Sequence, residues 1–210
     1  MQLNEIFDRI YIINLDEMKY KYDRSLLELK KINQDNVIRF SGIKINDGKT
    51  IADRRNGCRT SHINIIKECK RDGLHNVLIF EDDIEIDEKI ISYYEKIKNF
   101  LTNNEWNLFY LGGNHNYNSS VNRIYDTSYP YIKMTKDTLT THAYAINANV
   151  FDDLIISAEK HEYIDGFLRD SIQQRGKSFC IYPRMISQRT EFSYIENSDI
   201  DYNNLLKDKI

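Results

Sequence analysis

Apolar and polar positions follow two patterns that alternate along the chain. The first is the short, mostly apolar run of a strand inside a sheet, and it occurs over residues 9–15, 37–40, 77–80, 108–111 and 143–146. The second has an apolar residue at every third or fourth position, as in a helix that buries one stripe, and it occurs over residues 18–32, 58–70, 90–101, 150–158 and 164–172. Because strand and helix alternate, the sequence predicts an α/β fold with a mostly parallel central sheet flanked by helices, whose ligands sit at the carboxyl ends of the strands.

Two segments lie outside this alternation. Residues 114–137 are polar and aromatic, and they predict loops, with a hairpin as an option. Residues 196–210 are mostly polar and predict a loose C-terminal tail. Since the chain has no internal repeat and no linker, residues 1–195 are expected to form a single domain.

Charge and composition exclude several classes of protein. Lysine and arginine total 29 against 32 acidic residues, a net charge of −3 that is too close to neutral for a nucleic-acid partner. No window approaches the roughly 20 apolar residues of a membrane span, and the start lacks the features of a signal peptide. Three cysteines, Cys58, Cys69 and Cys180, form neither an even disulfide framework nor a CxxC pair. We expect reduced thiols and a cytoplasmic protein, with attachment to a membrane face through partners left open. The pattern does not indicate an oligomeric state.

Three consecutive carboxylates, Glu81, Asp82 and Asp83, follow the apolar run 77–80 directly. Adjacent anions repel one another and lose hydration when buried, so a cation is expected beside them. Mg²⁺ or Mn²⁺, bound by one or two carboxylates and by substrate phosphates, fits this requirement. The triplet alone is equally compatible with an exposed loop that caps the next helix. Its position at the end of a strand favours the metal site.

The helix predicted over 58–70 carries a histidine on its apolar stripe. His62 is expected to be buried there, and such a residue is more often a core histidine with one hydrogen bond than a catalyst. Cys58 lies one turn earlier and is placed to share a metal with His62. The two further ligands of a structural zinc site are not evident, so zinc is disfavoured.

Two later residues are also candidates for chemistry. His142 stands at the start of the strand 143–146, where side chains reach a ligand site, although a hydrogen bond to nearby backbone is an alternative. Asp165 is placed to act as a general base, but its residue type and spacing favour a helix cap or a pair with Arg169. GxxxxGK[ST] and GxGxxG motifs are absent, which excludes P-loop and dinucleotide-binding proteins.

Several motifs occur in an order that identifies a family resemblance. They are Tyr11 to Asp16 with Arg24, Gly57-Cys58-Arg59-Thr60-Ser61-His62, Val77 to Asp83, Thr141-His142-Ala143-Tyr144, Asp165, and Pro183 with Gln188. This ordered set resembles glycosyltransferase family 25, the lipooligosaccharide and collagen galactosyltransferase-like enzymes, over about residues 8–195. The combination of Gly-Cys-x-x-Ser-His, an apolar strand with Glu-Asp-Asp, and Thr-His-Ala-Tyr carries the resemblance.

The resemblance implies a GT-A type fold whose DxD-like motif holds Mn²⁺ or Mg²⁺ against the diphosphate of a UDP-sugar. It implies a metal bound by Asp83, Glu81 and Gln188. The residues implied to contact the nucleotide sugar are Asn14, Leu15, Arg24, His62, Glu81 and Asp82, with Arg24 contacting phosphate or bracing Asp16. It also brings His142, Asp165 and Gln188 to the sugar and acceptor side, with Asp165 as the base of an inverting displacement.

The implied activity is transfer of galactose or glucose from UDP-galactose or UDP-glucose to a hydroxyl of a glycan or glycosylated protein. A catalytically silent sugar-nucleotide or glycan-binding module with the same fold is the alternative, because fold does not guarantee activity. A nucleotidyltransferase is less consistent with the sequence. Such an enzyme usually has a glycine-rich basic loop after the first strand, where this chain has Asp16-Glu17-Met18-Lys19.

Overall fold

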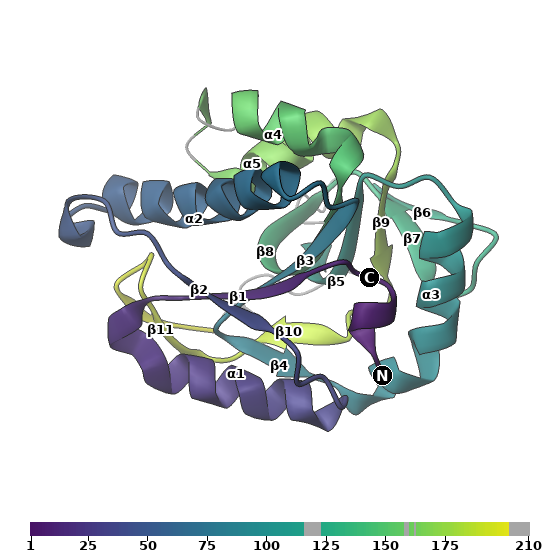
Figure 1. Ribbon diagram of the computed structural model, residues 1–210, viewed down its shortest axis with the longest axis horizontal. Coiled ribbons are helices and arrows are strands. Elements are labelled where there is room, and N and C mark those ends of the chain that lie inside the picture. Colours follow the sequence, from purple (N-terminus) through teal and green to yellow (C-terminus); the bar gives the residue numbers. More distant parts are fainter. Residues whose placement is uncertain (116–122, 158–159, 162, 202–210) are drawn as a thin grey trace.

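Each predicted apolar run forms a strand of one central sheet. The computed structural model describes residues 1–115, 123–157, 160–161 and 163–201. The strands are β1 (Ile10–Asn14), β2 (Ile38–Ser41), β3 (Asn76–Glu81), β5 (Leu108–His115), β6 (Ile124–Asp126), β7 (Ile132–Thr135), β8 (Thr138–Asn147) and β9 (Ser178–Ile181), in the spatial order β2-β1-β3-β8-β5-β9-β7-β6 (Figure 1). Six of these eight strands run in one direction and β8 and β7 run against them, so the predicted mostly parallel sheet is confirmed.

Helices cover both faces of the sheet. They are α1 (Lys19–Lys31), α2 (Ile51–Arg71), α3 (Tyr94–Asn103), α4 (Phe151–Ser157) and α5 (Ile164–Phe167), which continues into a π-helical turn over Leu168–Ile172. In Figure 1, α1 and α3 lie on one side of the sheet and α2, α4 and α5 on the other. Within the described residues, no helix combines the length and the apolar character needed to cross a bilayer.

The alternation of side chains along β3 decides which face its last residue meets. Leu78 and Phe80 belong to the apolar core on the side of α1 and α3, whereas Val77 and Ile79 belong to the core on the side of α2. Successive side chains of a strand point to opposite faces. Glu81 therefore follows Val77 and Ile79 toward α2, and this is why it meets a residue of that helix.

Helix α2 begins earlier than the predicted range of 58–70. Thr50 accepts a hydrogen bond from the Asp53 backbone N–H at 3.1 Å, and the Asp53 carboxylate accepts one from the Thr50 N–H at 3.0 Å. This capping box starts the helix at Ile51, and the Thr50-x-x-Asp53 pattern is visible in the sequence. The extra turns bring Arg54 and Arg55 to the wall of the cavity described below.

The two segments outside the predicted alternation contain short strands. Within 114–137, β6 and β7 form the expected hairpin, and residues 116–122 lie outside the described residues. Two small antiparallel pairs were not predicted: β4 (Ile84–Ile86) with β10 (Ile186–Gln188), and β11 (Glu191–Ser193) with β12 (Ser198–Ile200). The predicted tail thus begins with a paired strand, β12, while residues 202–210 lie outside the described residues.

Candidate functional site

A cavity of about 340 Å³ lies where β1, β2 and β3 end. Parallel pairing brings these ends together, since Ile13 of β1 pairs with Glu81 of β3 and Asn14 pairs with Ser41 of β2. Ten residues are predicted from the sequence to form the site. Eight of them line the cavity: Asn14, Leu15, His62, Glu81, Asp82, Asp83, Asp165 and Gln188.

Glu81, Asp82 and Asp83, the acidic triplet, form part of the cavity wall, and each carboxylate accepts a hydrogen bond from a different strand. The Asn14 amide of β1 donates to Oδ2 of Asp82 at 2.6 Å. The Thr141 hydroxyl of β8 donates to Oε1 of Glu81 at 2.6 Å, and the Gln188 amide of β10 donates to Oδ2 of Asp83 at 3.0 Å. Among the described residues, Oδ1 of Asp83 is shielded from solvent and accepts no hydrogen bond. One acceptor of the triplet is therefore unsatisfied.

Burial and mutual repulsion perturb these three carboxylates. Burial raises the pKa of Asp83 to about 7, and the charges of Glu81 and Asp82 add to the increase. Burial also raises the pKa of Asp82 to about 6, against the opposing charge of Lys21. Burial acts to raise the pKa of Glu81 as well, but the imidazole of His62, 3.5 Å away, outweighs it, and this pKa is lowered. The carboxylate of Glu81 is therefore ionised beside Asp82 and Asp83, whose ionised forms are disfavoured by burial. A divalent cation bound among them would offset the repulsion between the three negative charges.

Two basic residues that no sequence motif indicates, Arg189 and Lys21, lie beside the acidic turn. The guanidinium of Arg189 donates to the backbone carbonyls of Asp82 and Ile84, each at 2.5 Å, so it fixes the backbone that carries the carboxylates. The ammonium of Lys21 in α1 lines the cavity, donates to the Phe192 carbonyl at 2.6 Å and lies 3.6 Å from Glu191. Arg189 directly follows a predicted site residue, but only tertiary packing shows its partners.

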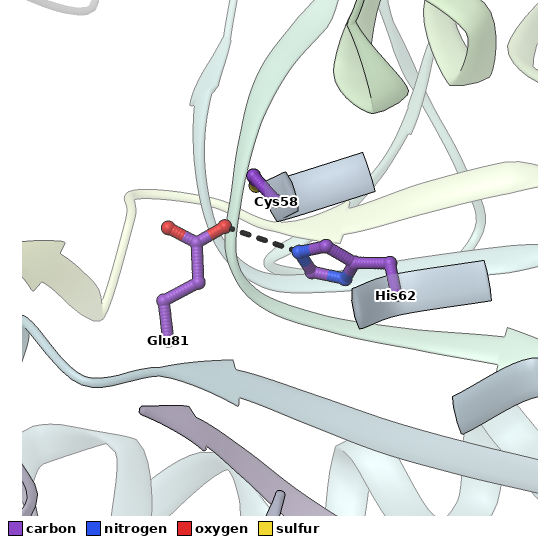
Figure 2. Close-up of side chains that lie close together, drawn as sticks. All are labelled: Cys58, His62 and Glu81. Carbon is purple, nitrogen blue, oxygen red and sulfur yellow. Dashed lines mark ion pairs between the residues drawn. The ribbon is translucent and has the colours of Figure 1, made fainter. Parts of the chain in front are cut away.

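His62 is fully buried in α2, as its place on the apolar stripe predicts. Its Nδ1 lies 3.0 Å from the Tyr144 hydroxyl, which is the single hydrogen bond expected of a core histidine. Its Nε2 points toward Oε1 of Glu81 at 3.5 Å (Figure 2). Cys58 lies one turn earlier in the same wall, and burial with the nearby carboxylates raises the pKa of its thiol well above the usual value. The cavity wall therefore contains a thiol, an imidazole and a carboxylate in one cluster.

Asp165 reaches the cavity from α5 and does not pair with Arg169, which contacts Asp170 instead. Its two oxygens accept the backbone N–H groups of Thr140 at 3.1 Å and Gly166 at 2.8 Å. Burial raises the pKa of Asp165, although these two hydrogen bonds oppose the increase. Thr140 has a φ of 66°, a left-handed conformation that is costly for a β-branched residue. Asp165 thus holds a strained segment of the cavity wall.

His142 does not line the cavity, contrary to the expectation for a histidine at the start of this strand. It is fully buried, and its Nε2 donates to the Ile186 carbonyl at 3.1 Å while Nδ1 lies 3.0 Å from the Thr140 hydroxyl. Burial lowers its pKa to about 4, so the ring is neutral. Gly112 permits this packing, because a Cβ there would lie 2.6 Å from Nε2 of His142. Of the two roles expected for His142, the structure therefore shows the hydrogen bond to a backbone carbonyl and not a place in the ligand cavity.

Arg24 also lies outside the cavity wall. Its guanidinium pairs with Glu191 at 2.8 Å, so the alternative in which Arg24 braces Asp16 is wrong. Asp16 is bound instead by Arg39 at 2.6 Å and by the Ser41 hydroxyl at 2.9 Å. The arginines that do line the cavity are Arg54 and Arg55 of α2.

Comparison with known structures assigns the fold. A glycosyltransferase involved in the glycosylation of the major capsid of PBCV-1 is 10% identical with a TM-score of 0.50, covering 90% of this chain and 96% of that chain. UDP-glucose pyrophosphorylase in complex with UDP-glucose is 10% identical with a TM-score of 0.41, covering 86% of this chain and 74% of that one. The likeness to the first of these structures, together with the strand order of the sheet, shows the mixed α/β, GT-A-like architecture predicted from the sequence.

Sequence comparison identifies the family. The sequence model of glycosyltransferase family 25, described as an LPS biosynthesis protein, matches residues 5–168. A search of curated proteins found no match to the chain. Because the family match spans most of the chain, this protein belongs to glycosyltransferase family 25.

Proposed function

We propose that this glycosyltransferase moves a hexose, galactose or glucose, from a UDP-sugar to a hydroxyl of a glycan or glycosylated protein. The observation that carries the proposal is the acidic triplet, which faces a cavity of about 340 Å³ at the carboxyl ends of the parallel strands. That volume is within the range of about 300–1,000 Å³ typical of small-molecule sites. We further propose that Mn²⁺ or Mg²⁺ binds at the triplet.

The donor groups of the triplet suit a hard cation. Carboxylate and amide oxygens are the ligands that Mg²⁺ and Mn²⁺ prefer. Asp83 is the proposed principal ligand, because its Oδ1 is buried and accepts no hydrogen bond from the described residues. Glu81 and Gln188 are the other two residues proposed to bind the cation. A cation bound there supplies charge stabilisation for a departing diphosphate.

The walls around the triplet suit the remainder of a nucleotide sugar. Asn14 and Leu15, at the end of β1, are proposed to contact the nucleoside. The cavity wall also carries the positive charges of Lys21, Arg54 and Arg55, which would attract a diphosphate. Arg24, outside the wall, is a weaker candidate for this contact.

Asp165 is the proposed general base. Its carboxylate is held by two backbone N–H groups, and burial raises its pKa toward the range in which a base is useful. In the proposed step, Asp165 takes the proton of the acceptor hydroxyl as the oxygen forms a bond to the anomeric carbon. The bond from that carbon to UDP breaks on the opposite face, so the configuration inverts.

The first experiment measures thermal unfolding with UDP, UDP-galactose, UDP-glucose and GDP-mannose, each with Mn²⁺ and with chelator. A ligand present at about 100 times its Kd adds roughly 2.7 kcal/mol to the stability of the folded state. We expect a Mn²⁺-dependent rise in Tm with the UDP compounds that Asp83→Ala abolishes. Asp152→Ala, at an exposed position in α4, is the matched control and should keep the rise.

The outcomes separate the proposed enzyme from its alternatives. Release of UDP from UDP-galactose or UDP-glucose in the presence of an acceptor supports the transferase. Release of pyrophosphate from UTP and a sugar 1-phosphate indicates a nucleotidyltransferase instead. Binding without turnover on a broad panel of glycan acceptors favours a silent sugar-nucleotide module. Absence of any nucleotide-dependent shift in the wild type would refute the donor site.

A further inference from the structure

The cavity wall contains a second set of metal-binding groups, and it differs in chemistry from the oxygen donors around Asp83. Cys58 and His62 project from successive turns of α2, and Glu81 projects toward them from the end of β3 (Figure 2). One ligand atom from each lies within 4.8 Å of the other two. Cys69 and Cys180 are buried members of the apolar core on the side of α2, and neither lines the cavity.

The geometry of this set suits a small tetrahedral ion. Nε2 of His62 and Oε1 of Glu81 are 3.5 Å apart. Two ligands bound to zinc at about 2.0–2.1 Å in tetrahedral geometry are separated by about 3.4 Å. The spacing i, i+4 on one helix places Cys58 and His62 on the same face, as in other helical metal sites.

His62 Nε2 also indicates a ligand that the protein itself does not supply. The imidazole is fully buried, and Nε2 makes no hydrogen bond within the part of the chain that the structure describes. A buried polar atom of this kind requires an explanation, and coordination of a metal provides one.

Outer contacts orient two of the three groups. The Tyr144 hydroxyl lies 3.0 Å from Nδ1 of His62, and the Thr141 hydroxyl donates to Oε1 of Glu81 at 2.6 Å. Ligating histidines and carboxylates usually have such partners, which fix the ring and the carboxylate in place.

We propose that Cys58 Sγ, His62 Nε2 and a carboxylate oxygen of Glu81 bind a transition-metal ion, Zn²⁺ in preference to Mg²⁺ or Mn²⁺. A thiolate and an imidazole select the softer ion, whereas the oxygen donors around Asp83 select the harder one. Three protein ligands leave a fourth position for water or substrate. On binding, the Cys58 S–H bond breaks, the sulfur forms a bond to the metal, and the proton passes to solvent. The proposal shares Glu81 with the proposed donor site, but Cys58 and His62 are not ligands of the cation proposed there.

The experiment titrates the metal-free full chain with Co²⁺, a spectroscopic substitute for Zn²⁺, and records absorbance. We expect a near-ultraviolet thiolate-to-cobalt charge-transfer band that saturates at one equivalent and is displaced by Zn²⁺ but not by excess Mg²⁺. Cys58→Ser should abolish the band, while Cys69→Ser and Cys180→Ser should keep it. Tyr144→Phe should weaken Co²⁺ binding about 10- to 100-fold, as loss of an outer contact does at other metal sites.

The cobalt titration of the wild-type protein can refute the proposal by itself, so the test does not require any variant to fold. Absence of a thiolate band at saturating Co²⁺ would leave His62 and Glu81 as a metal-free ion pair. Loss of the band in Cys69→Ser or Cys180→Ser, with retention in Cys58→Ser, would also refute the site. Asp83→Ala should lose the Mn²⁺-dependent UDP shift and keep the cobalt band, so the two proposals fail separately.

Discussion

The charge of Asp83 should destabilise the metal-free protein at neutral pH, and removing that charge should therefore stabilise it. Asp83→Asn keeps the shape of the side chain and an oxygen that can accept from Gln188. The pKa of Asp83 is raised from 3.8 to about 7, mainly by burial and then by Glu81 and Asp82. The folded state therefore binds the proton more tightly than the unfolded state, and wild-type stability falls as the pH rises from about 4 to 7.

The size of the expected stabilisation follows from the difference between the pKa of Asp83 in the folded state and in the unfolded state. A difference of about 3 pKa units corresponds to about 4 kcal/mol at pH 8. Because Asp83 as a whole residue is only partly buried, we take about half of this value, on the order of 2 kcal/mol, as the expected gain in Asp83→Asn. At pH 5 the wild-type carboxyl is mostly protonated in the folded state, so the gain should fall by more than half.

Urea denaturation in the presence of chelator, at pH 5 and pH 8, measures this difference directly. Asp152→Asn, whose side chain is 68% exposed, is the control and should change stability by less than about 0.5 kcal/mol at either pH. Saturating Mn²⁺ should reverse the order at pH 8, because the wild type then gains a ligand that the variant binds less well. An Asp83→Asn protein that is less stable than wild type at pH 8 in chelator, or equally affected at both pH values, would refute the reasoning.

Two further predictions test the base and the packing behind the cavity. Asp165→Asn should lower kcat by about 10²–10⁴-fold with little change in donor Kd, and an unchanged kcat in a steady-state assay would exclude Asp165 as the base. Gly112→Ala should cost about 1–3 kcal/mol in urea denaturation, because its Cβ would lie 2.4 Å from the Ile186 carbonyl oxygen and 2.6 Å from His142. The control Gly166→Ala has its nearest contact at 3.8 Å and should be nearly neutral; equal losses in the two variants would contradict the packing argument.

Local sequence signals predicted the position of the acidic triplet well. An apolar run that ends in three carboxylates implies a strand whose end is polar, and in an α/β sheet such an end meets a ligand site. The burial of His62 also followed from local sequence, because its stripe on α2 is periodic. The start of α2 was missed, although its capping box can be read in the chain.

The pattern of apolar and polar positions could not predict which side chains that are distant in the sequence contact one another. Asp16 has arginines at positions 24 and 39 as candidate partners, and the parallel register of β1 and β2 brings Arg39 rather than Arg24 to it. The β5–β8 pairing shifts register near Gly112, an irregularity without a periodic signal, and His142 nearby turns toward the Ile186 carbonyl of β10 instead of the cavity.

Sequence alone therefore determined the class of fold, the family resemblance and the strand end that carries the acidic groups. These properties depend on periodicity and on residues that are neighbours in the chain. The tertiary structure decided which side chains complete the site. Thr141 and His62 contact Glu81, Gln188 contacts Asp83, and Arg189 binds the backbone carbonyl of Asp82. These contacts join elements that are 19 to 107 residues apart in sequence. Register, helix placement and burial set them, and all three arise only when the whole chain packs.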